Sequence, residues 1–251
     1  MEVPPVYACP WPPAPDEVSI PEDELHLWCT SLDLAAWRID ELRRTLCEEE
    51  QRRAARFRLG RLRDHFIAAR GTLRTVLARY VGTEPAALRF EYQYHGKPVL
   101  ASDGGPRRLH FNLSHSHGVA VIAVAGRELG VDVEWVRPRD SAGQLVQRFF
   151  SEDEKRQWEQ LPAEFQPLAF FHGWTRKEAW LKAVGSGLTF PLSEFCVSMM
   201  PGEPARVLSI CGNESDAAVW WLDSCVPSPH YVAATAIRGQ PAVIRRWQCG
   251  Y

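Results

Sequence analysis

Hydrophobic positions along the chain follow two spacings, the two-residue period of strands and the longer period of helices. Apolar side chains between Asp64 and Tyr80 recur at helical spacing, and Gly82 ends that pattern. Helices are predicted at residues 40–57, 64–80, 151–160 and 168–184. Strands are predicted at residues 25–31, 111–113, 119–125, 131–135, 190–200, 217–222 and 231–237.

The order of these elements predicts an α+β fold in two lobes, because each half of the chain offers helices together with an antiparallel sheet. We expect an N-terminal lobe over residues 23–126 and a C-terminal lobe over residues 127–251. Seven prolines among the first 21 residues disfavour a helix or a central strand. Residues 1–22 are therefore expected to form a Pro-rich, flexible leader.

The composition argues against several classes of protein. The chain has 29 Lys and Arg against 31 Asp and Glu, so its formal charge of −2 provides no basic field for nucleic acid. The seven cysteines are scattered and form no C-x-x-C pair, which disfavours a zinc site or a disulfide framework. No apolar run approaches the roughly 18 residues of a membrane span. The N-terminus also lacks a signal-peptide pattern, so we expect a cytoplasmic protein without membrane contact.

Two carboxylates lie two residues apart in the predicted strand GVDVEWV. Side chains of a strand alternate between faces, so Asp132 and Glu134 project to the same side. Like charges held together favour a bound cation, and a hard divalent ion such as magnesium would share its coordination with a phosphate substrate. The alternative is an exposed polar face of an edge strand.

A second cluster lies in the segment WTRKEAWLKAVGSGL. Trp174, Glu178 and Lys182 follow one another at four-residue spacing, so they share one face of a helix, with Lys177 beside them. A carboxylate and an ammonium on one face suit a phosphate site with a metal ion. The same pair also occurs as an ordinary surface ion pair.

Other polar groups lie in the first half of the chain. Ser114 and His115 belong to HFNLSHSHG, which we interpret as a turn that can present donors to phosphate, or as a simple turn. The turn HGKP presents Lys97. Arginines of the helical region match phosphate geometry but equally suit a solvated face: Arg53, Arg56, Arg63 and Arg70.

Taken together, six segments resemble the Sfp-type 4'-phosphopantetheinyl transferase superfamily over about residues 25–237. They are HGKP, HFNLSHS, LGVDVE, FFSEDE, WTRKEAWLKAVGSGL and YVAATAI. The resemblance implies two similar lobes related by a pseudo-twofold axis, with coenzyme A in the cleft between them. Because one chain supplies both lobes, we expect a monomer.

The activity that the resemblance implies is that of a magnesium-dependent enzyme of the holo-[acyl-carrier-protein] synthase type. Such an enzyme moves phosphopantetheine from coenzyme A, its co-substrate, to a serine of an apo acyl or peptidyl carrier protein and releases 3',5'-ADP. Asp132, Glu134 and Glu178 would bind the magnesium ion. We hypothesise that Glu178 acts as general base, directly or through a metal-bound water, and that Lys182 stabilises or protonates the departing phosphate.

The resemblance also implies the residues that contact coenzyme A. They are Arg53, Lys97, Ser114, His115, Asp132, Lys177 and Lys182. Arg137, Arg139 and Arg148 follow the metal strand and are expected to meet an acidic carrier protein, although loop arginines commonly just contact solvent.

Two rival functions use the same residues. A non-catalytic module would bind coenzyme A or a carrier protein, and it would be expected to lack at least one of the carboxylates. A metal-dependent phosphohydrolase would use the acidic cluster with water as the nucleophile. Breakdown of coenzyme A without a protein acceptor would distinguish that hydrolase from a transferase.

Overall fold

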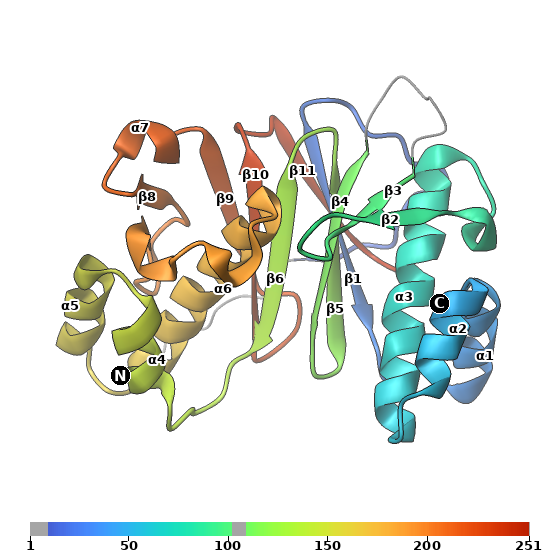
Figure 1. The fold of residues 1–251 in the computed structure, drawn as a ribbon, viewed down its shortest axis with the longest axis horizontal. Helices are drawn as coiled ribbons and strands as arrows, with labels where there is room; N and C mark the ends of the chain where they lie inside the picture. The colour runs from blue at the N-terminus through green and yellow to red at the C-terminus, as the bar shows by residue number, and fades with distance from the viewer. Residues whose placement is uncertain (1–9, 102–108, 251) are drawn as a thin grey trace.

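The computed structural model describes residues 10–101 and 109–250 and has the predicted α+β architecture. Two sheets lie at the centre, and helices cover both outer sides (Figure 1). Among the residues described, no helix is long and apolar enough to cross a membrane. The α-helices are α1 (Ala36–Arg44), α2 (Glu48–Ala55), α3 (Gly60–Val81), α4 (Ala142–Phe149), α5 (Glu152–Gln160), α6 (Gln166–Val184) and α7 (Glu214–Ala217).

The two central sheets have strand orders β11-β1-β5-β4 and β6-β10-β9. Their pairs are antiparallel except for β1 with β11, which is parallel. The first sheet contains β1 (Glu24–Ser31), β4 (His110–Ser116), β5 (Val119–Ala125) and β11 (Val243–Gln248), and the second contains β6 (Leu129–Trp135), β9 (Trp220–Cys225) and β10 (Tyr231–Arg238). Two hairpins add β2 (Phe90–Tyr92) with β3 (Pro98–Leu100), and β7 (Phe195–Val197) with β8 (Val207–Ile210).

A shared apolar core joins the two sheets. Leu27 and Val121 of the first sheet pack with Val131 and Ala233 of the second. Every residue of β5 is buried, because α3 packs against the face of the first sheet that points away from this core. Burial on both faces explains why β5 is continuously apolar rather than alternating.

Helix α6 packs directly on β6 at Gly130. A Cβ at this position would lie 2.2 Å from the Ala179 oxygen and 2.3 Å from the Ala183 nitrogen, both of them backbone atoms. Only a glycine permits this approach, since backbone atoms of a helix cannot move aside cheaply. The contact therefore fixes how α6 lies across the strand that carries Asp132 and Glu134.

The structure confirms most predicted elements and changes several boundaries. The helix expected at residues 40–57 is two helices, α1 and α2, because Thr45 donates its hydroxyl to the Leu42 carbonyl and Cys47 starts a new helix with Glu50 in a capping box. The strand expected at residues 217–222 lies at β9, three residues later, after α7. Helices α4 and α7 and strands β8 and β11 were missed.

The two ends of the described chain lie against the first sheet. Gln248 of β11 donates its backbone N–H to the Pro12 carbonyl at 2.8 Å, and Trp11 packs partly buried against the shared core. The described part of the expected leader, residues 10–22, thus contains no helix and no strand of a sheet, but its contacts with β11 and the core hold it in place. The lobe boundary expected near residue 126 falls between β5 and β6, whereas β11 joins the sheet of the other lobe.

The close approach at Gly130 gives a prediction on stability. Gly130→Ala should lower the free energy of unfolding by at least about 1–3 kcal/mol, because its Cβ would collide with backbone of α6. Urea denaturation measures this, with Gly60→Ala as the control, since a Cβ there would meet nothing nearer than the Arg63 side chain at 3.9 Å. Equal stability of the two variants would contradict the packing argument.

Candidate functional site

The candidate site lies where β4 and β6, the edge strands of the two sheets, run side by side (Figure 1). Asp132 and Glu134 of β6 project toward this seam. Ser114 of β4 donates its hydroxyl to Asp132 Oδ1 at 2.9 Å, and Ser116 donates to Glu134 Oε2 at 2.9 Å. The two-residue period of β4 thus matches that of β6, and each carboxylate has its own serine.

Helix α6 contributes the remaining charged groups. Lys182 Nζ lies 2.6 Å from Asp132 Oδ1 and 3.0 Å from Ser114 Oγ. Glu178, one helical turn earlier, lines the same cavity as Lys182. The structure therefore brings together the strand and the helix that carry the three predicted carboxylates. Glu178 and Lys182 share one face of α6, as their four-residue spacing predicted.

Negative charge exceeds positive charge in this cluster. Burial, followed by the charge of Asp132, raises the pKa of Glu178, and the same two causes raise the pKa of Glu134. Asp132 Oδ2 is buried and accepts no hydrogen bond from any described residue. The three carboxyl groups carry more negative charge than the Lys182 ammonium balances, so a further cation would be favourable here.

This donor set fits a small, hard cation, because carboxylate oxygens are the ligands that magnesium prefers. In the arrangement of residues 10–101 and 109–250, however, no three acidic, His or Cys side chains are already grouped around one point. The Lys182 ammonium instead neutralises Asp132. Asp132 Oδ2 and the carboxyl groups of Glu134 and Glu178 are the groups available to a metal ion.

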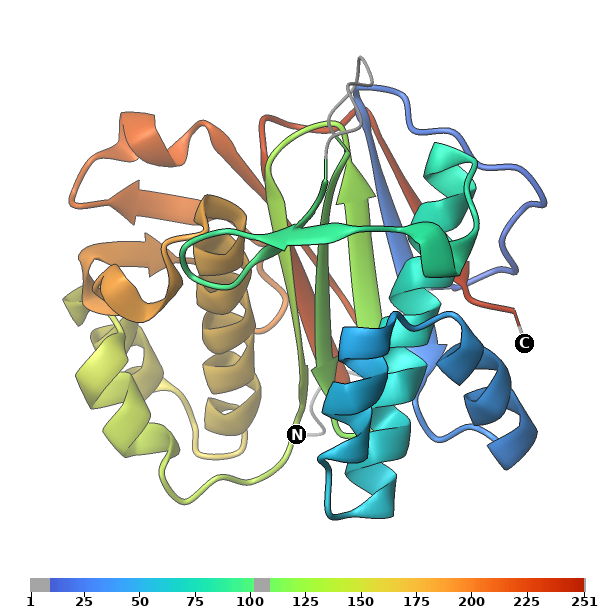
Figure 2. The same cartoon turned by 45° about the vertical axis from the view of Figure 1, so that its right-hand side comes forward.

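A cavity of about 240 Å³ opens beside the cluster. It lies between α6 and the β2–β3 hairpin, which reaches across from the helical side of the first sheet (Figure 2). Its lining residues are His95, Gly96, Lys97, Pro98, Asn112, Glu178, Leu181, Lys182, Gly185 and Gly187. The cavity thus combines segments of both predicted lobes, as a cleft site requires.

His115 lies on β4 between the two serines, so its ring projects to the opposite face of the strand. Partial desolvation, together with the charges of Lys182 and His65, lowers its pKa. The strand predicted at residues 111–113 thus continues to Ser116, through residues that were predicted to form a turn, and only His117, with a φ of 51°, begins the turn.

Two further polar residues belong to this seam, and the sequence did not predict their place there. Asn112 Oδ1 accepts the backbone N–H of Val131 at 2.9 Å and so bridges the two sheets, and Ser116 binds Glu134. The signal was present in HFNLSHS, where Asn112, Ser114 and Ser116 alternate with other residues. Treating that segment as a turn concealed the shared face.

The predicted arginines lie outside the cavity lining. Arg53 is exposed on α2, with its guanidinium 5.2 Å from the centre of the Phe66 ring. Arg70 forms an ion pair with Glu50 and stacks over Phe90 at 4.2 Å. A role for Arg53 at coenzyme A stays a prediction.

Lys177 does not lie where a ligand-binding role requires. Its side chain is 0% exposed, and its ammonium pairs with Glu154 at 2.8 Å and donates to the carbonyls of Leu192 and Phe195. The prediction that Lys177 contacts coenzyme A is therefore wrong on geometry, because the helix turns this side chain into the core of the C-terminal lobe, away from Glu178.

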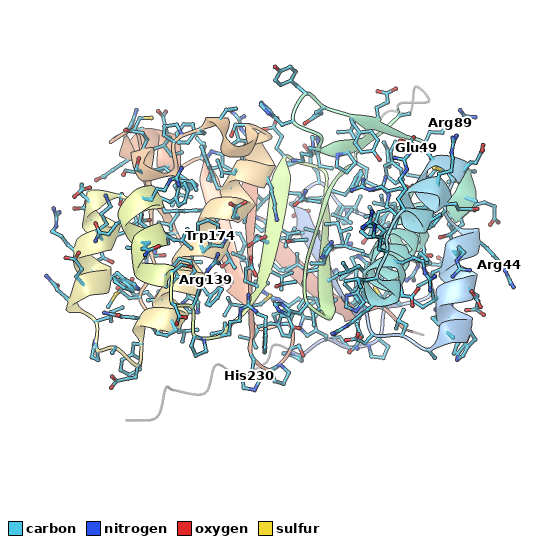
Figure 3. All side chains as sticks on the ribbon, turned by 60° about the horizontal axis from the view of Figure 1, so that its bottom comes forward. Arg44, Glu49, Arg89, Arg139, Trp174 and His230 are labelled. Atoms are coloured by element: carbon cyan, nitrogen blue, oxygen red, sulfur yellow. The ribbon has the colours of Figure 1, made fainter. Side chains whose placement is uncertain are left out.

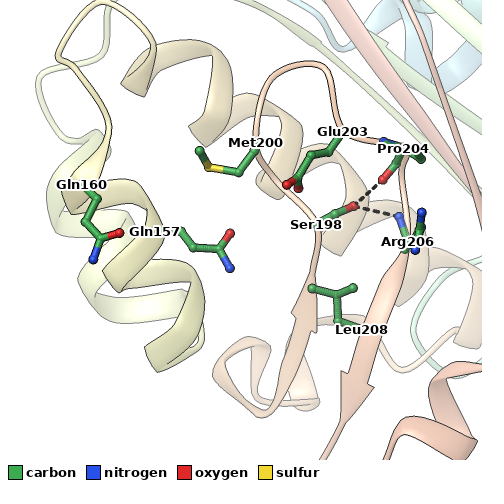
Figure 4. A pocket seen from close by; sticks show the side chains of 8 residues that line it. All are labelled: Gln157, Gln160, Ser198, Met200, Glu203, Pro204, Arg206 and Leu208. Atoms are coloured by element: carbon green, nitrogen blue, oxygen red, sulfur yellow. Dashed lines mark hydrogen bonds between the residues drawn. The ribbon is translucent and has the colours of Figure 1, made fainter.

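A larger hollow than this cavity lies elsewhere on the described surface. It measures about 670 Å³ between α5 and the β7–β8 hairpin (Figure 4). Its lining residues are Gln157, Gln160, Ser198, Met200, Glu203, Pro204, Arg206 and Leu208. None of them is a predicted site residue, so size alone does not mark the site.

Of the three arginines predicted to meet a carrier protein, two lie beyond the carboxyl end of β6. Arg137 Nη1 is 3.4 Å from His117 Nε2, and Arg139 reaches Phe170 of α6. Arg139 and Trp174, which also stacks on Phe170, lie in the same lobe, far from Arg44 of α1 (Figure 3). Arg148 lies over Phe149 of α4.

Comparison with known proteins agrees with the resemblance in the sequence. A model of the 4'-phosphopantetheinyl transferase N-terminal region matches residues 36–127, and the model of the 4'-phosphopantetheinyl transferase superfamily matches residues 128–236. The chain is 38% identical over 230 residues to the 4'-phosphopantetheinyl transferase HetI of Nostoc sp., which covers 91% of this chain and 94% of that protein. The chain therefore belongs to the 4'-phosphopantetheinyl transferase superfamily.

Other relatives match shorter stretches. The 4'-phosphopantetheinyl transferase Sfp of Bacillus subtilis is 31% identical over 127 residues, 51% of this chain and 54% of that protein. Among solved structures, a holo-(acyl-carrier-protein) synthase from Bacillus anthracis in complex with CoA has 22% identity and a TM-score of 0.33, over 40% of this chain and 91% of that one. That structural likeness is weak.

The buried ion pair of Lys177 gives a second prediction. Lys177→Met should lower the free energy of unfolding by about 3–5 kcal/mol, because Glu154 would keep a buried charge without its partner. Chemical denaturation measures this, with Lys155→Met as control. Lys155 pairs with Glu152, whose side chain is 79% exposed, so its loss should cost less than about 1 kcal/mol. A small effect at Lys177 would contradict the structural role.

The raised pKa of Glu178 gives a third prediction. A carboxyl whose pKa is higher in the folded chain than its usual 4.5 binds its proton more tightly when folded, so stability falls as pH rises through the folded pKa. In EDTA, Glu178→Gln should therefore raise the melting temperature at neutral pH, and the gain should shrink toward the usual pKa. Glu152→Gln is the exposed control. A gain that is independent of pH would refute the assigned electrostatics.

Proposed function

We propose that this chain is an enzyme that transfers 4'-phosphopantetheine from coenzyme A to a serine hydroxyl of an acyl or peptidyl carrier protein. The observation that carries the proposal is the cluster of Asp132, Glu134, Glu178 and Lys182 beside a cavity that is lined by segments of both predicted lobes. Family membership supports the same conclusion. Coenzyme A is the proposed co-substrate and 3',5'-ADP the second product.

Glu178 is the proposed acceptor of the proton of the carrier serine. Burial and neighbouring negative charge raise its pKa, so it is a stronger base than an ordinary surface glutamate. The serine oxygen would form a bond to the β-phosphorus of coenzyme A as the bond from that phosphorus to the bridging oxygen breaks. The bridging oxygen leaves with 3',5'-ADP.

Lys182 is the proposed donor to the phosphate groups. Its ammonium already lies 2.6 Å from Asp132 Oδ1 and 3.0 Å from Ser114 Oγ, so it is held at the cluster before substrate arrives. A preorganised cation stabilises the charge that develops on the departing phosphate. Ser114 and His115 are proposed to lie near the nucleotide end of the ligand, where the positive surroundings of His115 suit a phosphate.

Magnesium is the proposed metal, held by Asp132, Glu134 and Glu178. When bound, it would supply positive charge to the pyrophosphate and so polarise the leaving group. The buried, unpartnered Asp132 Oδ2 supports this assignment. Ligand and base are competing roles for Glu178, since a carboxylate bound to a cation loses basicity. Substantial turnover of Glu178→Gln at saturating magnesium would exclude the role as base.

We also infer a cytoplasmic monomer, in which Arg137 and Arg139 meet acidic groups of the carrier protein. Both arginines lie beyond the carboxyl end of β6, on the side of Glu134. Burial and the charge of Asp132 raise the pKa of Glu134, and the charge of Arg139 offsets a small part of that rise. Charged rims of this kind accelerate association with an oppositely charged partner. Their replacement by glutamate should raise the apparent KM for the carrier without changing that for coenzyme A.

The activity is tested by intact-mass measurement of apo carrier proteins after incubation with coenzyme A and magnesium. We expect a phosphopantetheine mass gain, and a loss of rate of about 100-fold or more in Asp132→Asn, because Asp132 holds both Lys182 and the proposed cation. Asp153→Asn, which changes an exposed acid of α5, is the matched control.

Three outcomes of this assay are distinct. Mass gain that requires both magnesium and Asp132 supports the proposal. Tight coenzyme A binding without mass gain on any carrier would contradict it and favour a binding module. Breakdown of coenzyme A without a carrier would contradict it in favour of a hydrolase.

A further inference from the structure

The Lys97 ammonium is held by three backbone carbonyls. Its Nζ lies 2.9 Å from the Leu129 oxygen, 2.6 Å from the Lys182 oxygen and 3.2 Å from the Ala183 oxygen. A lysine ammonium has three N–H donors, so these three acceptors use all of them. Burial lowers the pKa of Lys97 to about 8, so at neutral pH the group is still mostly protonated.

The acceptors are groups that need a partner. Lys182 and Ala183 lie in the last turn of α6, whose carbonyls have no partner within the helix, and Leu129 is the first residue of β6. A cation at the carboxyl end of a helix is also favoured by the helix dipole. Lys97 therefore connects the β2–β3 hairpin to the two elements that carry the candidate site.

The hairpin also packs tightly on the loop that follows α6. A Cβ on Gly185 would lie 3.3 Å from Gln93 Oε1, and a Cβ on Gly187 would lie 3.4 Å from the His95 ring. Both glycines have positive φ, 74° and 57°, so the loop follows a path that other residues rarely adopt. Packing and the Lys97 contacts thus act at the same junction.

We propose that Lys97 is a positioning residue, which clamps the hairpin onto the carboxyl end of α6 and thereby fixes the cavity wall that faces coenzyme A. One of the three carbonyls that Lys97 binds belongs to Lys182, whose side-chain ammonium donates to Asp132. Because its three donors are occupied, Lys97 orients the site and does not contact the co-substrate. This role replaces the direct contact with coenzyme A that was expected from the sequence. The effect on coenzyme A rests on the proposed function, whereas the clamp itself does not.

The clamp is tested with Lys97→Met, which keeps the length and apolar stem but removes the three donors. Lys155→Met on α5 is the matched control. Hydrogen exchange should be faster at the amides of Gln93 and Gly96, which close the hairpin, and at Gly185, which ends α6. In the transferase assay, the KM for coenzyme A should rise about tenfold, as expected for lost hydrogen bonds to a charged group, while the KM for the carrier stays unchanged.

A second variant protects the test against misfolding. Gly187→Ala would press on the His95 ring from the opposite side of the junction and strain the backbone at a positive φ, so the same amides and the same KM should change in the same direction. Unchanged exchange in both variants would overturn the clamp. Faster exchange with an unchanged KM for coenzyme A would overturn its role in positioning. A wild-type protein without transfer activity would refute the proposed function, and the exchange data would still decide the clamp.

Discussion

The approach of α6 to β6 at Gly130 is the contact on which the rest of the site depends. Asp132 and Glu134 lie on the strand, and Glu178 and Lys182 lie on the helix. The approach of these two elements therefore sets the distances between the first pair of side chains and the second. A larger residue at Gly130 would collide with backbone atoms that belong to the same turns as Lys182. The site is therefore a consequence of packing in the C-terminal lobe.

The charged groups of the cluster also depend on the first sheet, through its edge strand β4. Ser114 and Ser116 supply hydroxyl donors from β4, and Asn112 joins the backbone of the two edge strands. Buried carboxylates are costly unless they receive hydrogen bonds or a cation, and here the hydroxyls satisfy only part of that requirement. The residual negative charge, seen in the raised pKa values of Glu134 and Glu178, is what makes the seam suitable for a metal ion.

The sequence was sufficient to predict the α+β class, which follows from the order of the elements, and the same-side placement of Asp132 with Glu134, which follows from the two-residue period. The shared helix face of Glu178 and Lys182 followed from the helical period in the same way. Periodicity could not predict that Lys177, next to Glu178, points into the core to meet Glu154. That result depends on the tertiary position of α5, and no local pattern contains it. Strand β11 was missed for a similar reason. Its residues are partly exposed and two of them are charged, and only the pairing with β1, which is distant in sequence, makes them a strand.

The two lobes are joined at three levels, and each has a different physical basis. The apolar core between the sheets sets their mutual position, and the parallel pairing of β11 with β1 brings the carboxyl end of the chain back to the first sheet. The polar junction of Lys97 with α6 lies at the cavity itself. Because a hairpin of two three-residue strands is only marginally stable alone, its shape at the cavity depends on its contacts with the rest of the chain. Phe90 packs on Phe111 of β4 at the base of the hairpin, and Lys97 and the packing on Gly185 and Gly187 hold the part that lies beside α6.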